Sequence, residues 1–223
     1  MPASMHDTII FDFDGTLIDS AVGILATYSA VLAAAGIKPA APLDSRLIGP
    51  PLLPTMSKLT GPIAPEQLDV LVEDFKVRYA DIGVARTPAY PAADATLKQL
   101  LAGGKILYLA TNKRAQPTLA LLDKFGWAPY FQRVYCIDSH QPAFTDKAAM
   151  LRQLLSENQI DPAQALYVGD TQGDYLSASA CGIRFVAALW GYEDWQVLPD
   201  DHAMREHAYA SLSEMSNALT PRR

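Results

Sequence analysis

The order of short apolar runs along the chain is the feature that most restricts its fold. Five such runs, at residues 8–13, 105–110, 133–137, 165–168 and 184–189, are too short for helices and rich in Ile, Val, Tyr and Phe, which predicts buried strands. Helical patterns lie between most of them, and several end at a glycine such as Gly126 or Gly182, the usual helix terminator. Because strands that alternate with helices form a parallel sheet covered on both faces, we expect an α/β fold.

One interval interrupts this alternation. Residues 19–87 contain no strand pattern but two helical patterns, one from Ile24 to Ala35 and one from Leu68 to Tyr79, with seven of the sixteen prolines between them. An insertion directly after the first strand predicts a small helical lobe. We therefore expect a core domain of residues 1–18 and 88–223 and an inserted helical cap domain of residues 19–87.

The charge of the chain limits its partners. The 223 residues carry a net charge of −6, so we expect neither a nucleic-acid nor a membrane partner. No Lys or Arg precedes Lys38, whereas targeting peptides carry such residues early. The uncharged stretch 20–37 is too diluted by Gly, Ser and Thr to predict a membrane span. We expect a cytoplasmic protein, either a monomer or a homodimer.

Acidic residues follow two of the predicted strands. The first run ends in Asp12-Phe13-Asp14-Gly15-Thr16, and the fourth is followed by Gly169-Asp170 with Asp174 four residues later. In open parallel sheets, ligands bind beyond the carboxyl ends of the strands. Carboxylates that converge there repel one another unless a cation is present. A hard divalent ion with oxygen ligands, for which Mg²⁺ is the best candidate, removes this conflict.

Phosphate-binding groups follow the other strands. The second run ends in Thr111-Asn112-Lys113, and Lys147 stands where the helix after the third run begins. A lysine, a hydroxyl and backbone N–H groups at helix starts suit a phosphate. A carboxylate beside Mg²⁺ and phosphate suggests phosphoryl transfer through an aspartyl-phosphate.

These four segments, in this order and at these intervals, resemble the motifs of the haloacid dehalogenase superfamily. The chain is similar over nearly its whole length to the phosphoglycolate-phosphatase-like branch, which has a helical cap between the first motif and the second strand. The resemblance implies a Rossmann-like parallel core with helices on both faces, plus the small α-helical cap. It also implies a hydrolase, namely a Mg²⁺-dependent phosphatase that acts on a small phosphomonoester.

The resemblance also assigns roles at the metal site. Asp12 would be the nucleophile and a Mg²⁺ ligand. Asp14 would act as general acid and then as general base, with its backbone carbonyl on the metal. Asp170 and Asp174 would complete the metal site, the latter directly or through water.

The remaining roles concern the substrate. Thr111 and Lys147 would hold the phosphoryl oxygens, and the backbone of Asn112 would add a donor. Arg46 lies in a segment similar to the stretch that faces the active site in capped relatives, so it would touch the leaving group. A proline-stiffened loop is an equally good interpretation of that segment.

The sequence leaves other functions open. A sugar-phosphate mutase is disfavoured because the third motif reads Thr145-Asp146-Lys147-Ala148 and lacks the Lys-Pro pair common in mutases. A phosphate-ester-binding regulator without turnover is the alternative outside enzymes. Phosphoglycolate, a nucleoside monophosphate, pyrophosphate and a sugar phosphate all fit as substrates, because contacts from the cap decide among them.

Overall fold

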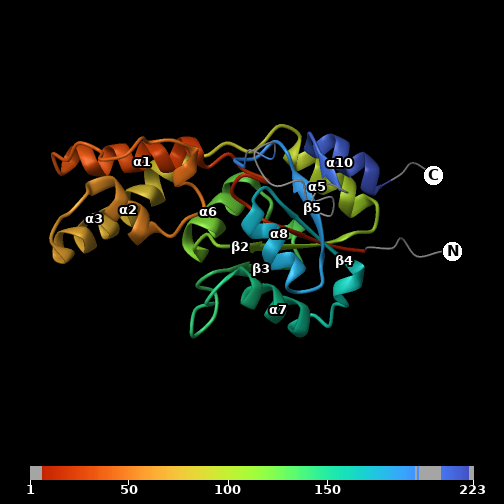
Figure 1. Ribbon diagram of the computed structural model, residues 1–223. Coiled ribbons are helices and arrows are strands. Elements are labelled where there is room, and N and C mark those ends of the chain that lie inside the picture. Colours follow the sequence, from red (N-terminus) through yellow and green to blue (C-terminus); the bar gives the residue numbers. More distant parts are fainter. Residues whose placement is uncertain (1–6, 194, 196–206, 221–223) are drawn as a thin grey trace. The chain divides into compact units, whose positions relative to one another are not determined.

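The computed structural model describes residues 7–193, 195 and 207–220. The chain forms two compact units (Figure 1). One consists of the described residues of Met1–Ile18 and Ala89–Arg223, and the other is the insertion Asp19–Pro88. Among the described residues, the helices are all too short or too polar to cross a bilayer.

The larger unit contains a parallel sheet of six strands in the order β3-β2-β1-β4-β5-β6. The strands are β1 (Thr8–Phe11), β2 (Ile106–Thr111), β3 (Arg133–Cys136), β4 (Ala165–Gly169), β5 (Arg184–Ala188) and β6 (Ala208–Tyr209). The five predicted runs coincide with β1 to β5, so the predicted α/β class is confirmed. β6 was not predicted, because a two-residue strand has no periodicity of its own.

Helices cover the sheet. They are α5 (Ala93–Ala102), α6 (Ala115–Phe125), α7 (Lys147–Glu157), α8 (Gln172–Ser179) and α10 (Leu212–Leu219), with short 3₁₀ turns η3 (Ala128–Tyr130) and η4 (Pro162–Gln164). Helices α7 and α8 pack together against Ile10, Tyr108 and Tyr167. Helices α5 and α10 pack against each other on the opposite side (Figure 1). The central strands are therefore apolar on both faces, as parallel strands between helix layers must be.

Two helix starts bring polar residues to the carboxyl edge of the sheet. Asp146 caps α7, and its Oδ1 accepts a hydrogen bond of 2.7 Å from the N–H of Ala149. Thr171 caps α8 in a reciprocal capping box with Asp174. These caps fix where α7 and α8 begin, and so fix the positions of Lys147 and Asp174.

The insertion is a helical unit with its own core. It contains α1 (Ala21–Ala34), η1 (Ser45–Leu47), α2 (Leu52–Thr60), α3 (Pro65–Arg78), the π-helical turn η2 (Tyr79–Gly83) and α4 (Val84–Arg86). The rings of Tyr28 and Phe75 lie 4.4 Å apart at the centre of that core. Helices α1 and α3 coincide with the two helical patterns in the sequence. Helix α2 was not expected in this proline-rich stretch; it tolerates Pro54 because first-turn N–H groups have no partner within a helix.

Candidate active site

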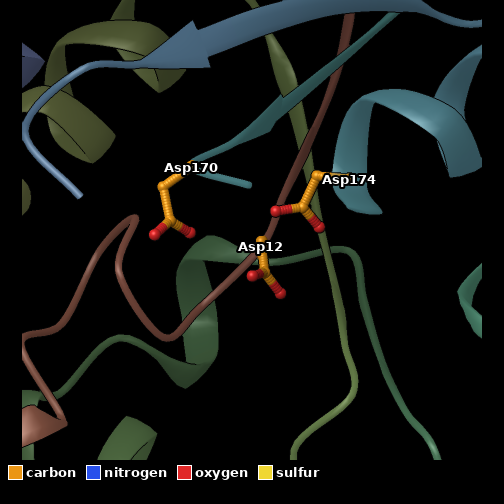
Figure 2. A group of neighbouring side chains, drawn as sticks. All are labelled: Asp12, Asp170 and Asp174. Carbon is orange, nitrogen blue, oxygen red and sulfur yellow. The ribbon is translucent and has the colours of Figure 1, made fainter. Parts of the chain in front are cut away.

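Three buried carboxylates meet at the carboxyl edge of the sheet. Asp12 follows β1, Asp170 follows β4, and Asp174 lies in the first turn of α8 (Figure 2). Each has an oxygen within 4.8 Å of an oxygen of the others. Strands β1 and β4 are the neighbours at which the strand order reverses. A parallel sheet opens a ligand-binding crevice at such a switch point.

Backbone geometry holds Asp170 in place. Its Oδ2 accepts a hydrogen bond of 2.8 Å from the N–H of Tyr192, and Thr16 Oγ1 lies 3.4 Å from its Oδ1. Gly15 has a φ of +80°, and a Cβ there would lie 2.1 Å from Asp170 Oδ2. Only glycine fits that position, since any side chain would displace the carboxylate.

Lys147 is buried between two of the carboxylates. Its Nζ lies 3.0 Å from Asp12 Oδ1 and donates a hydrogen bond to Asp174 Oδ1. The other oxygen of Asp174 accepts hydrogen bonds from the N–H and Oγ1 of Thr171. Burial lowers the pKa of Lys147, but the charges of Asp12 and Asp174 outweigh burial and hold that pKa well above its usual value. Lys147 is therefore a fixed cation.

The site contains more negative charge than Lys147 balances. Burial, with smaller contributions from Asp174 and Asp14, raises the pKa of Asp12 from 3.8 to about 7, against the opposing charge of Lys147. The pKa of Asp170 is also well above its usual value, mainly because it is buried. Within the described part of the chain, Asp12 Oδ1 is paired with the ammonium of Lys147 at 3.0 Å, and no other group donates a hydrogen bond to it. These carboxylates fit a divalent cation, which would offset the negative charge that Lys147 leaves unbalanced.

Comparison with known proteins identifies the family. The sequence model of the family described as "Haloacid dehalogenase-like hydrolase" matches residues 9–188. The chain belongs to this family. It is 33% identical over 194 residues to a phosphoglycolate phosphatase of Psychrobacter arcticus, which covers 82% of this chain and 84% of that protein. It is 32% identical to phosphoglycolate phosphatase 1 of Pseudomonas aeruginosa, with 86% and 73% covered.

A solved structure shows the same fold. A haloacid dehalogenase-like family hydrolase from Streptococcus pneumoniae superposes with a TM-score of 0.81 at 24% identity, covering 97% of this chain and all of that one. The resemblance to the phosphoglycolate-phosphatase-like branch of the family, and with it the expectation of a hydrolase, is confirmed.

The remaining expected residues of this haloacid dehalogenase-like hydrolase lie in three places. Thr111 is the buried last residue of β2, and its Oγ1 accepts a hydrogen bond of 3.2 Å from the N–H of Lys113. Asn112 follows it and is exposed. Arg46 belongs to η1 in the insertion, where its guanidinium binds both oxygens of Asp44. Thr111 thus ends the strand beside β1, whereas Arg46 is engaged within its own unit.

Sequence reasoning gave no role to Lys113, Trp190 or Gly191, although each contacts a residue of the site. Asp14 is partly buried in the turn after β1, and its Oδ1 pairs with Lys113 Nζ at 2.9 Å. Trp190 Nε1 donates a hydrogen bond of 2.9 Å to the carbonyl of Thr16, and a Cβ on Gly191 would lie 2.2 Å from that of Asp170. Two features of the sequence could have indicated these contacts. One is the lysine that ends Thr111-Asn112-Lys113, and the other is the Trp-Gly-Tyr sequence after β5.

Proposed function

We propose that this protein is a Mg²⁺-dependent phosphatase that hydrolyses a small phosphomonoester through a phosphorylated Asp12. The observation that carries the proposal is a buried Asp12 carboxylate that pairs with the buried Lys147 and lies beside two further buried carboxylates. The curated relatives are named phosphoglycolate phosphatases, which supports phosphoglycolate as the first substrate to test. Nucleotides and sugar phosphates are the other members of the substrate class.

The side chains of Asp12, Asp170 and Asp174 and the backbone carbonyl of Asp14 would hold the Mg²⁺. When bound, this ion neutralises the clustered carboxylates and the phosphoryl oxygens, and so permits an anionic nucleophile to approach an anionic substrate. The donor set is made of oxygens, which is the chemistry that Mg²⁺ prefers.

The first half of the reaction transfers the phosphoryl group. The Thr111 hydroxyl, the Asn112 backbone N–H and the Lys147 ammonium bind the phosphoryl oxygens and orient the phosphorus toward Asp12. A carboxylate oxygen of Asp12 attacks the phosphorus as the ester P–O bond breaks. The departing oxygen takes the proton of the Asp14 carboxylic acid and leaves as an alcohol.

The second half releases phosphate. Asp14, now a carboxylate, accepts a proton from a water molecule that attacks the phosphorus of phospho-Asp12. The bond between the Asp12 oxygen and phosphorus breaks, and inorganic phosphate leaves. Lys147 remains a cation throughout, because its pKa lies well above its usual value.

The insertion supplies selectivity in this proposal. Arg46 would exchange its partner Asp44 for an anionic group of the substrate's leaving portion, since an exposed ion pair costs little to break. We place the enzyme in the cytoplasm as a monomer or homodimer, with a small phosphate ester as its partner, in keeping with its net charge of −6.

The test uses two esters that differ in leaving group, p-nitrophenyl phosphate and phosphoglycolate, each with Mg²⁺ and with a chelator. The wild-type protein should release phosphate from at least the first ester only when Mg²⁺ is present. Asp12→Asn should abolish release, whereas Asp123→Asn, on the exposed face of α6, should retain it. Full activity in Asp12→Asn, or activity that survives chelation, would refute the proposal.

A further inference from the structure

Lys113 is a buried cation to which the reaction above gives no task. Its side chain is only 6% exposed, and its Nζ lies 2.9 Å from Oδ1 of Asp14, which is itself 18% exposed. A buried ammonium needs a partner, and a charge-assisted hydrogen bond of this length is among the stronger ones in proteins. The two residues are 99 positions apart in the sequence, so the fold brings them together.

The backbone of Lys113 is tied to the ends of two strands. Its N–H donates to Thr111 Oγ1 at 3.2 Å, and its carbonyl accepts a hydrogen bond of 3.4 Å from the N–H of Ile137. Thr111 ends β2, and Ile137 follows β3. The ammonium group therefore extends from a segment held at both sides, and the turn after β1 that carries Asp14 is held by backbone hydrogen bonds of its own, such as that from the N–H of Gly15 to the carbonyl of Ile18 at 2.9 Å. The ion pair therefore joins two ordered segments of the larger unit.

We propose that Lys113 is a positioning residue that holds the Asp14 carboxyl group where it can transfer a proton to and from the reacting oxygens. This inference rests on the proposed phosphatase function and on the role of Asp14 in it. Lys113 touches neither the phosphorus nor the leaving oxygen in this assignment; it acts through Asp14. The carboxyl group of a side chain in a turn is otherwise free to sample several rotamers, and each misplaced rotamer lowers the rate of proton transfer.

The leaving group separates this role from a merely structural one. An alkoxide is strongly basic and needs the proton of Asp14 as it departs, whereas p-nitrophenolate is stable without it. General acid catalysis contributes roughly 10²- to 10⁴-fold. We therefore expect Lys113→Met to lower kcat/KM for phosphoglycolate by about 10- to 100-fold more than for p-nitrophenyl phosphate. A general loss of folding or of phosphate binding would lower both by the same factor.

Two further variants serve as controls. Lys113→Arg keeps the charge and should recover most of the difference between the two esters. Lys105 stands just before β2 as Lys113 stands just after it, is equally buried at 6% exposure, and pairs with Asp7 at 3.8 Å. Lys105→Met therefore removes a matched buried cation at the opposite end of the same strand, and it should change both kcat/KM values by one common factor.

A double-mutant cycle with Asp14→Asn tests whether the two residues act as one unit. Adding Lys113→Met to Asp14→Asn should not lower kcat/KM for phosphoglycolate any further, because the carboxyl group that Lys113 positions is already absent. If Lys113→Met lowered kcat/KM for phosphoglycolate as much in Asp14→Asn as in the wild-type protein, the proposal would be overturned. It would also be overturned if Lys113→Met lowered kcat/KM for the two esters by the same factor. Failure of the wild-type protein on both esters, or full activity of Asp12→Asn, would instead refute the phosphatase function itself.

Discussion

Replacing Asp12 by Asn should stabilise the metal-free protein even though it removes the proposed nucleophile. Burial is the largest cause of the rise in the pKa of Asp12 from 3.8 to about 7. Asp12 is 6% exposed, so solvent screens little of this effect. At 1.36 kcal/mol per pH unit, the difference corresponds to about 4 kcal/mol of folding free energy that the ionised carboxylate costs. Asparagine has the same shape and cannot ionise.

The sign of the pH dependence follows from which state binds the proton more tightly. The folded protein holds the Asp12 proton up to about pH 7, and the unfolded chain releases it near 3.8. The stabilising effect of that proton is fully present below pH 3.8 and is lost as the pH rises to 7. The unfolding free energy of the wild-type protein should therefore fall relative to Asp12→Asn by up to about 1.4 kcal/mol per pH unit within this window.

Urea unfolding with a chelator present, followed by tryptophan fluorescence, measures this difference. Trp127, Trp190 and Trp195 all lie outside the insertion, so the signal reports on the larger unit. Between pH 5 and pH 8, the stability advantage of Asp12→Asn should grow by about 3 kcal/mol. Mg²⁺ at a hundred times its dissociation constant should stabilise the wild-type protein by about 2.7 kcal/mol, and the variant by less. An advantage that does not change with pH, or that shrinks, would refute this reasoning.

Two other substitutions test separate parts of the structure. Gly15→Ala should weaken Mg²⁺ binding at least about 10-fold by titration calorimetry, because a Cβ there collides with Asp170 Oδ2. Gly104→Ala, which has a similar φ of +81° but open space around it, should leave that affinity unchanged, and equal effects would contradict the account. Hydrogen bonds, led by that from Gln153, lower the pKa of Glu157 to about 2. Glu157→Gln should therefore lower the melting temperature at pH 7, where the stabilisation by the ionised carboxylate is fully present. The difference in melting temperature from the wild-type protein should disappear as the pH falls from 4.5 toward 2, and a difference that is the same at every pH would contradict this explanation.

The sheet and the acidic cluster could be predicted from local patterns. Strands β1 and β4 are buried at every residue, and β2 and β5 at every residue but the first, so their sequences are nearly continuous apolar runs. In a parallel sheet the residues after such runs lie at one edge, which is why Asp12 and Asp170 could be placed near each other. The burial of Lys147 was harder to anticipate, since a lysine at a helix start is usually exposed; its two carboxylate partners account for it.

Features that depend on contacts distant in sequence could not be predicted. Nothing near Lys113 in the sequence indicates that it pairs with Asp14, because the β1 turn and the end of β2 meet only in the folded sheet. Gly191 follows β5, and its close approach to Asp170 likewise depends on the finished fold. Helix α2 was missed for another reason: prolines count against a helix unless they fall in its first turn, and the position of that turn was not evident.

The most direct test of the central claim is the site of phosphorylation. The protein should be mixed with a phosphate ester and Mg²⁺, quenched in acid within the first turnover, and examined by intact mass and peptide mapping. Our account predicts one added phosphoryl group on the peptide that contains Asp12, with none in Asp12→Asn. A phosphoryl group on another residue, or rapid turnover with no phosphorylated protein at any quench time, would contradict it.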